Sequence, residues 1–343
     1  MRPLLNTLFV TTQGSYLSRD GLTVSISVER EVRARVPIHT LNSIVCFGVV
    51  TCSPFVLQLA SENGVSLVHL TEHGRFIARM QGRTQGNVLL RRTQFRTADD
   101  MSASARIARS ILVGKVSNAR TVLQRGARES ESEVARERLE HAALRLARLM
   151  PDLARADDLD TLRGFEGDAA AIYFGAFDAL IADPSDAFRF TGRSRRPPLD
   201  NVNALLSFLY ALLASDVAAA LESVGLDPQV GFLHRDRPGR ASLALDLMEE
   251  LRAPVADRVA LSLINRRQVR SSGFERGDTG GITMADATRK AVLAEWQSRK
   301  TEEIRHPFLN EIVPIGLLPY VQSLLLARYL RGDIDGYPPM LWK

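Results

Sequence analysis

The sequence predicts an α+β protein in which a small N-terminal β domain, residues 1–97, precedes a larger all-α domain, residues 98–343. Short runs of β-branched residues with partial alternation fill the first hundred residues, as in half-buried strands. Beyond residue 97, apolar residues recur at helical spacing with charged residues between them. A chain of 343 residues is also longer than the commonest single domain, so two domains are expected.

Strand patterns fill most of the N-terminal domain, which we expect to be β-sandwich-like. Pro37 lies inside one run and suits an edge strand, because proline cannot donate a ladder hydrogen bond. The last run folds back at His73–Gly74, which predicts two strands around a turn. We expect "GSYLSRDG" to separate the first two strands. The runs are "LLNTLFVTT" (4–12), "GLTVSISVE" (21–29), "RARVPIHTLNSIVCFG" (33–48) and "VSLVHLTEHGRFIARMQG" (65–82).

One short helix is predicted within this domain, at "SPFVLQLASENG". Ser53 fits its N-cap, because a serine hydroxyl can accept a hydrogen bond from a free N–H of the first turn. Pro54 suits the first turn, and Gly64 suits the end.

The second domain is predicted to be built from helices and loops. Amphipathic patterns cover residues 99–127 and 130–150, and loops are expected at 183–198 and 270–281. The segment 199–225 is apolar on most of its circumference, which predicts a central buried helix. Its most apolar part, "ALLSFLYALLA", is shorter than the roughly 20 residues of a membrane span, so we expect no membrane association.

Charge and cysteine content narrow the class of partner and compartment. The formal net charge is +5, and 40 of the 44 basic residues are arginine, since only four are lysine. Arginine binds phosphate through a planar fork of donors, which favours nucleic acid, although codon usage in a GC-rich genome would give the same bias. Cys46 and Cys52 are too few for a disulfide framework, and the N-terminus lacks a signal-peptide pattern. We therefore expect a cytoplasmic protein.

Several familiar motifs are excluded. "HRD" at 234–236 matches the kinase catalytic loop, but Ala241 stands where that loop needs asparagine. "GKVS" at 114–117 lacks the earlier glycine of a phosphate-binding loop, because Arg109 occupies that position. No cysteine and histidine spacing matches a structural zinc motif, and no serine lies in a nucleophile elbow.

A histidine among arginines is the first candidate for chemistry. His234 lies in "GFLHRDRPGRASLALDLMEEL", residues 231–251, and Pro238–Gly239 turns the chain before a predicted helix. The turn would let the loop fold back over that helix. A histidine and a carboxylate that converge there would form a nitrogen and oxygen site for a transition-metal ion or magnesium.

The following helix supplies the acids. Ser242 suits its N-cap, and Asp246, Glu249 and Glu250 follow at spacings of three and four, so they share a face. By itself, this pattern of acids is typical of a solvated acidic surface. Together with His234, a carboxylate of this helix would supply the second of two ligands of a metal ion.

A further ligand is expected from "TLRGFEGDAAAIYFGAFDALI". Gly164 and Gly167 flank Glu166, and we expect a helix that begins here, with Glu166 and Asp168 in its first turn. Acids in a first turn are favoured by the helix dipole, which is one explanation of the pattern. The other is that the glycines leave room for a ligand or a DNA backbone beside Glu166.

Basic loops provide candidate DNA contacts, because clustered arginines with nearby aromatic residues suit phosphate contacts and base stacking. Any arginine-rich protein contains such clusters, so the signal is weak by itself. The candidate residues are Arg193, Arg195, Arg196, Arg235, Arg237, Arg240, Arg266, Arg267 and Arg270.

Four segments together resemble the CRISPR adaptation integrases, the first of the two universal Cas protein families. They are "LRGFEGDAAAIYF", "RSRRPPLDNVNALLSFLYALL", "GFLHRDRPGRASLALDLMEELR" and "GITMADATRKAVL", in this order. The resemblance covers essentially the whole chain, and its length and wording are similar to the variant of type I-C systems.

The resemblance implies a set of site residues. Glu166, His234 and Glu249 match the family's ligands for a divalent ion, Mn²⁺ or Mg²⁺, although many members have aspartate at the last position. Asp246 matches a further active-site acid. Tyr210 resembles an active-site tyrosine of some members, and a core tyrosine is an equal alternative.

The resemblance also implies the function. Family members join the 3′-hydroxyl ends of a prespacer to a repeat array by transesterification and cleave branched DNA. They form a homodimer, which we expect through the β domain, and a heterohexamer with a small second adaptation protein on double-stranded DNA. His234 would act as ligand, general acid or both. Two alternatives are a metal-dependent nuclease of DNA repair without integration and a non-catalytic DNA-binding scaffold.

Overall fold

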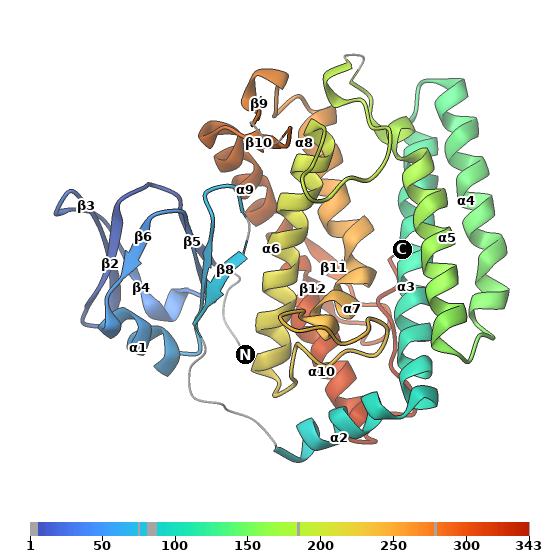
Figure 1. Cartoon of the computed structure of the whole chain (residues 1–343), viewed down its shortest axis with the longest axis horizontal. Helices are drawn as coiled ribbons and strands as arrows, with labels where there is room; N and C mark the ends of the chain where they lie inside the picture. Colours follow the sequence, from blue (N-terminus) through green and yellow to red (C-terminus); the bar gives the residue numbers. More distant parts are fainter. Residues whose placement is uncertain (1–5, 75, 81–87, 184–185, 278–279, 343) are drawn as a thin grey trace.

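The computed structural model describes residues 6–74, 76–80, 88–183, 186–277 and 280–342. Figure 1 shows strands β1–β8 and helix α1 on one side of the molecule and the long helices on the other. The division into an N-terminal β region and a mainly helical remainder confirms the predicted α+β class.

Two four-stranded sheets form the β region. The first has the order β1-β5-β7-β8, and the second has the order β4-β3-β2-β6. The segment "SYLSRD", expected as a separator, is strand β2: Leu17 is fully buried while its neighbour Tyr16 is exposed, an alternation that the polar residues conceal in the sequence. The bounds are β1 Thr7–Val10, β2 Ser15–Asp20, β3 Thr23–Val28, β4 Glu31–Pro37, β5 Ser43–Phe47, β6 Val50–Cys52, β7 Ser66–Leu70 and β8 Phe76–Arg79.

The sequence predicted the details of helix α1, Pro54–Glu62, and the edge position of strand β4. Ser53 is its N-cap, and the Ser53 hydroxyl accepts a hydrogen bond from the backbone N–H of Val56 at 3.2 Å. Gly64 follows the helix with φ of +65°, a conformation that glycine adopts without strain. Pro37 ends β4, which is an edge strand as expected.

Strand β5 of the first sheet is buried on both faces. Ile44 and Cys46 of β5 point into the core between the two sheets, whereas Val45 and Phe47 point into the core of the helical part. Phe47 stacks on Phe208 of the central helix with ring centroids 5.8 Å apart. Parallel strands covered on both faces are expected to be apolar almost throughout, as "SIVCF" is.

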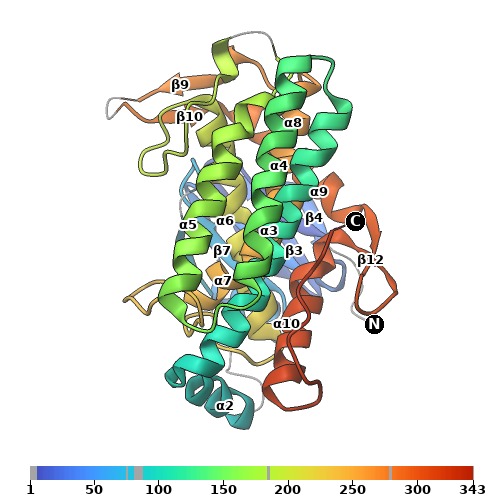
Figure 2. The same ribbon diagram turned by 90° about the vertical axis from the view of Figure 1, so that its right-hand side faces the viewer.

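The apolar helix α6 is largely buried, as predicted, and lies between the β region and the other helices (Figure 1), while Figure 2 shows α5 and α3 on the far side of the helical part. α6 contacts α7, α8 and α10. By length and composition α6 would be able to cross a membrane, but 61% of its most apolar window is buried inside the protein, which explains its composition. The bounds are α2 Val88–Asp99, α3 Met101–Glu129, α4 Glu133–Leu153, α5 Leu159–Ala176, α6 Asn201–Ser223, α7 Ser242–Leu251, α8 Arg258–Asn265, α9 Asp286–Thr301 and α10 Leu318–Leu330.

The helical part also contains short strands that the sequence analysis missed. β9 (Phe274–Arg276) pairs with β10 (Ile282–Met284), so part of the expected loop 270–281 is a hairpin. β11 (Glu303–Arg305) pairs with β12 (Ile312–Pro314). Three-residue strands are too short for their alternation to be recognised. The predicted boundary near residue 97 falls at the end of α2, a helix that contacts α3 and α10.

Glu250 ties the C-terminal segment to α7. Its side chain is fully buried and accepts hydrogen bonds from the Tyr337 hydroxyl, the Gln322 amide and the backbone N–H of Met340, each at 2.8 Å. Asn118 of α3 donates to the Glu250 carbonyl at 2.7 Å. Burial raises the pKa of the Glu250 carboxyl to about 8, although these donors act to lower it. Glu250 therefore does not lie on a solvated acidic face, which is the interpretation that the pattern of acids favours when it is read alone.

We expect Glu250 to make the protein less stable as pH rises from about 5 to about 8. The raised pKa means that the folded state holds this proton, while the unfolded chain, in which glutamate has its ordinary pKa of 4.5, releases it. Stability falls with pH wherever the folded state binds more protons. Glu250→Gln removes this titration. In this variant, the slope of the free energy of unfolding against pH should be less negative than in the parent protein by up to about 1.4 kcal/mol per pH unit. Urea unfolding at a series of pH values measures both slopes.

Glu137→Gln on the exposed face of α4 is the matched control, and its slope should equal that of the parent protein. Equal slopes for Glu250→Gln and the parent would show that Glu250 does not titrate in this range.

Candidate active site

Three of the predicted side chains converge. Glu166 lies on α5, His234 lies in the loop between α6 and α7, and Glu249 lies on α7. One ligand atom from each residue lies within 4.8 Å of the others. The helices α5 and α7 both pack against α3, and this shared neighbour brings the two carboxylates together.

Two cations hold the carboxylates in place. Lys115 of α3 lies 2.9 Å from an oxygen of Glu166 and 2.9 Å from Oε2 of Glu249. Arg252 lies 2.8 Å from Oε1 of Glu249. Burial acts to raise the pKa of the Glu249 carboxyl, but Arg252 and Lys115 outweigh it and lower the pKa to about 2. Glu249 is therefore ionised at neutral pH.

Sequence analysis missed both cations. Arg252 follows Glu249 by three residues, and that spacing on a helix is a signal for an ion pair. Lys115 precedes Glu166 by 51 residues and carries no local signal in the sequence.

Asp246 fixes the loop that carries His234. It is fully buried, and its carboxylate accepts backbone hydrogen bonds from Phe232 at 2.7 Å, Leu233 at 2.9 Å and His234 at 3.0 Å. His234 Nδ1 lies 2.5 Å from Asp246 Oδ1, which leaves Nε2 for the two glutamates. The loop also passes too close to Asp246 for a side chain at Gly231, where a Cβ would lie 2.8 Å from Oδ2.

The acids of α7 are therefore not a solvated surface. Asp246, Glu249 and Glu250 are all buried, and each has its own donors or cations, so their mutual repulsion is offset. The expected N-cap is also wrong, because α7 begins at Ser242 and its side chain makes no capping bond. α7 ends at Leu251, and a π-helical turn, Arg252–Asp257, leads directly from it into α8.

Glu166 does not lie in the first turn of a helix, so that expectation is wrong. α5 begins at Leu159, where Asp158 accepts from the Thr161 N–H at 2.8 Å, and the helix dipole therefore does not explain Glu166. Nothing lies within 4 Å of a Cβ built at Gly164 or at Gly167. The open space expected beside Glu166 is thus present. Asp168 is exposed and lies outside the cluster.

Tyr210 belongs to a buried network beside the cluster. Its hydroxyl donates to Asp257 at 2.7 Å, and the Tyr173 hydroxyl donates to the same carboxylate at 2.9 Å. Arg252 lies over the Tyr210 ring at 5.0 Å from its centroid, within cation–π distance. Tyr210 therefore contacts the site through the arginine that binds Glu249.

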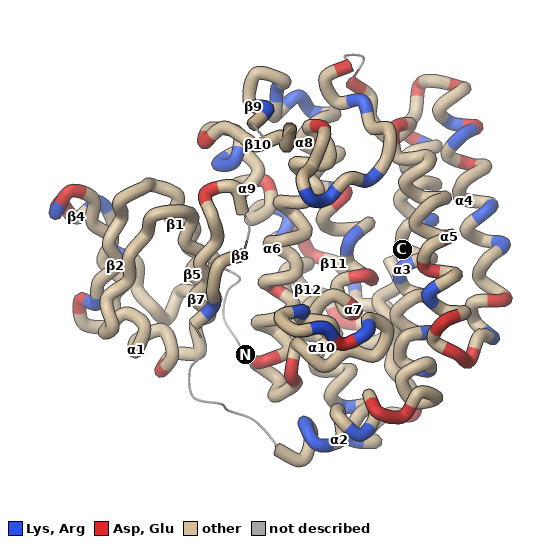
Figure 3. The backbone as a smooth tube through the Cα atoms, in the orientation of Figure 1, with Lys and Arg blue, Asp and Glu red and all other residues tan. Residues whose placement is uncertain are grey.

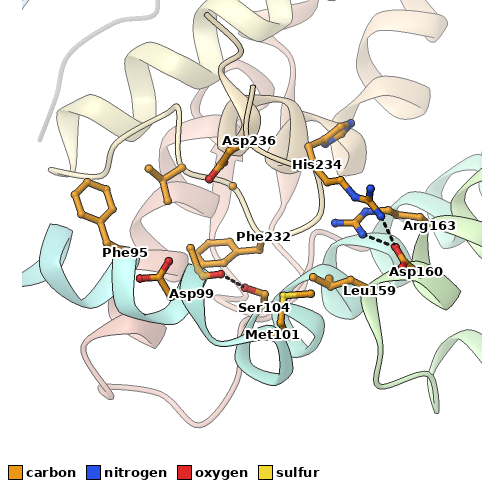
Figure 4. Close-up of a pocket in the computed structure, with 14 residues that line it drawn as sticks. Phe95, Asp99, Met101, Ser104, Leu159, Asp160, Arg163, Phe232, His234 and Asp236 are labelled. Carbon is orange, nitrogen blue, oxygen red and sulfur yellow. Dashed lines mark hydrogen bonds and ion pairs between the residues drawn. The ribbon is translucent and has the colours of Figure 1, made fainter. Parts of the chain in front are cut away.

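A cavity of about 500 Å³ opens beside His234 (Figure 4). Phe232 and Asp160 line it, and Arg163 and Arg235 both form ion pairs with Asp160, at 2.7 and 2.9 Å. Glu166 and Glu249 do not line this cavity. It therefore reaches the cluster only at His234.

The candidate DNA-binding arginines fall into two groups. Arg193 is partly buried, donates to Asn203 at 2.6 Å and lies over the Tyr210 ring, so it has an internal role. Figures 2 and 3 show the loops before α6 and before α7, with basic segments, on the same face of the helical part. The exposed or half-exposed members are Arg195, Arg196, Arg235, Arg237, Arg240, Arg266, Arg267 and Arg270.

The donor set of the cluster fits a divalent cation. Two carboxylates and one imidazole suit Mn²⁺, and Mg²⁺ with a weaker preference for the nitrogen. The two buried Glu249 oxygens lie at ion-pair distance from Arg252 and Lys115, yet neither receives a hydrogen bond of good geometry. A metal ion that coordinates these oxygens would therefore compete with Lys115 and Arg252 for the Glu249 carboxylate.

Comparison with known sequences gives a consistent result. The family model of the CRISPR associated protein Cas1 matches residues 8–298. The chain is 52% identical over 343 residues to a protein of Chlorobaculum tepidum named CRISPR-associated endonuclease Cas1, with both chains covered completely. A protein of Rhodospirillum rubrum with the same name is 52% identical over 347 residues, again with complete coverage.

Solved structures share the fold. A CAS1 protein from Thermotoga maritima superposes with a TM-score of 0.80 at 24% identity, covering 96% of this chain and 97% of that one. A casposase bound to integration product gives a TM-score of 0.84 at 20% identity, covering 99% of this chain and 95% of that one. On the family match and the full-length relatives, the chain belongs to the Cas1 family of CRISPR-associated proteins.

Proposed function

We propose that this protein is a DNA integrase and endonuclease of CRISPR spacer acquisition. It joins the 3′-hydroxyl ends of a prespacer to the repeat array by transesterification and cleaves branched DNA. The observation that carries the proposal is the convergence of Glu166, His234 and Glu249 from three separate elements. Its full-length relatives are named endonucleases.

The three residues of the cluster share one role, and two neighbouring residues have others. Glu166, His234 and Glu249 would hold Mn²⁺ or Mg²⁺, which when bound neutralises charge on a phosphate and favours ionisation of a hydroxyl. Asp246 positions the His234 ring and keeps Nε2 directed to the site. Lys115 lies between the two glutamates, so it offers positive charge beside the scissile phosphate.

The proposed partners are DNA, a second copy of this chain and the small second adaptation protein, in a cytoplasmic heterohexamer. Two solved neighbours of this fold are Cas1–Cas2 complexes by title. Exposed large apolar residues on the β region support a dimer formed there. They are Tyr16, Leu22, Val32, Val49, Phe55, Phe76 and Ile77. The type I-C assignment is part of this proposal and rests on the sequence resemblance.

Glu249→Gln should reduce strand joining by roughly 100-fold or more, because the substitution removes a charge that holds the metal ion. The assay incubates a labelled DNA with a 3′-hydroxyl end, a repeat-containing duplex and manganese, and separates joined from cut products on a gel. Joined strands support the integrase, whereas cut ends alone support a repair nuclease.

Asp168→Asn is the matched control, since Asp168 lies two residues from Glu166 on the same helix but is exposed. It should join DNA at the parent rate. Parent-level joining by Glu249→Gln would refute the proposed site, and DNA binding without any metal-dependent product would favour a scaffold.

Lys115→Met should tighten manganese binding by about tenfold or more, because Lys115 places a positive charge next to both glutamates and competes with a cation. Calorimetric titration of manganese into each protein measures this change. Lys290→Met, on the exposed face of α9, should bind manganese as the parent does. Weaker binding in Lys115→Met would show that the lysine organises the site and does not compete for it.

Binding to double-stranded DNA should weaken by roughly 1,000-fold between 50 and 200 mM salt if about six phosphates are contacted. Arg195→Gln and Arg237→Gln should each lower the salt slope by about one. Fluorescence anisotropy at several salt concentrations gives these slopes. Arg33→Gln on the exposed edge strand β4 should leave the slope unchanged, and an unchanged slope in all three variants would place the DNA surface elsewhere.

A further inference from the structure

The only two cysteines of the chain lie together, beside a histidine, far from the cluster of Glu166, His234 and Glu249. Cys46 lies on β5, Cys52 ends β6 and His69 lies on β7. One ligand atom from each of the three residues lies within 4.8 Å of the others. Cys52 Sγ and His69 Nε2 are 3.8 Å apart.

The fold of the β region builds this cluster from rigid elements. Cys46 and His69 are register partners on adjacent parallel strands of the first sheet, so their side chains point to the same face. Cys52 belongs to the second sheet and pairs with Leu17. Immediately after it, Ser53 donates its backbone N–H to Leu17 at 2.9 Å and caps α1. The three side chains are therefore held by three strands from two sheets.

The geometry points to a zinc site, and we propose that Cys46, Cys52 and His69 bind one Zn²⁺ ion. Zinc with tetrahedral bonds of about 2.3 Å to sulfur and about 2.1 Å to nitrogen separates a sulfur from a nitrogen ligand by about 3.6 Å. The observed 3.8 Å between Cys52 and His69 is close to that value. A water molecule would complete the tetrahedron, because Cys52 and His69 are only partly buried.

The protonation of the cluster suits this ion. A hydrogen bond from Cys46 lowers the pKa of the Cys52 thiol to about 5, against the opposing effect of burial and with help from His69. The hydrogen bond with Cys52 and burial raise the pKa of the Cys46 thiol. Because zinc binds thiolates, Zn²⁺ binding would release any proton that the two thiols still hold.

The two candidate metal clusters found among the described residues differ in chemistry. Thiolates and imidazole select zinc and other soft ions, whereas the Glu166, His234 and Glu249 cluster has no sulfur and suits harder ions. The zinc site would cross-link the two sheets of the β region. It does not depend on the proposed function.

Cobalt substitution of the full-length protein tests the proposal. Reduced, metal-free protein titrated with Co²⁺ should develop a thiolate-to-cobalt charge-transfer band in the near ultraviolet and the visible bands of a tetrahedral site. Both should saturate at one equivalent, and Zn²⁺ should abolish them. The active-site cluster cannot produce the charge-transfer band, because it has no sulfur ligand. Absence of that band in the reduced parent protein would overturn the proposal.

Variants locate the ligands. Cys52→Ser and His69→Asn should each weaken zinc binding by roughly 100-fold or more, since loss of even an outer partner costs 10–100-fold. His39→Asn changes an exposed histidine of the same region and should bind zinc as the parent does. Parent-level zinc affinity in both Cys52→Ser and His69→Asn would overturn the assignment. Should either variant fail to fold, the cobalt spectrum of the parent still decides. Thiol counting that shows a Cys46–Cys52 disulfide, with no cobalt band after reduction, would identify a redox pair instead.

Discussion

The structure depends on the burial of three carboxylates along a single short helix, α7. An unpaired charge in a protein interior costs several kcal/mol, so each acid requires its own compensation. The three solutions differ. Asp246 takes backbone N–H groups and a histidine, Glu249 takes two cations, and Glu250 takes neutral donors from the C-terminal segment. These partners come from α3, from the loop before α7 and from the end of the chain. The need of the three carboxylates for hydrogen bonds and ion pairs therefore determines how those segments pack against α7.

Because the three carboxylates of α7 have different partners, neighbouring residues of this helix have different roles. Cations lower the pKa of Glu249 to about 2, which leaves a charged carboxylate without a well-directed hydrogen bond, as a metal ligand requires. Neutral donors and burial raise the pKa of the adjacent Glu250 to about 8, which suits a group that joins helices. Asp246 has a third role, because four contacts to one loop orient His234. One helix thus supplies a candidate metal ligand in Glu249, a group that positions His234 in Asp246, and a group that holds the C-terminal segment in Glu250.

The β region and the helical part also differ in the kind of metal ligand that each provides. Carboxylate and imidazole ligands lie in the helical part and sulfur ligands lie in the β region, so the two candidate clusters suit metal ions of different character. The first sheet connects the regions, since Cys46 faces the inner β core while Phe47, its neighbour, stacks on Phe208 of α6. An ion that locks Cys46 to Cys52 would therefore stiffen the sheet on which α6 rests.

The sequence by itself determined the α+β class, the capped helix after Ser53 and the central helix α6, because these follow from local periodicity and capping. Glu166, His234 and Glu249 were also identifiable, through motif resemblance. Only the tertiary structure decided which acids are buried, that Lys115 lies between the two glutamates, and that the cysteines meet His69. Those facts are contacts between elements, such as the one that spans 51 residues from Lys115 to Glu166, and no local pattern encodes them. A helical face of acids looks the same in sequence whether it meets water or a set of buried donors, because the partners that make burial tolerable come from distant segments.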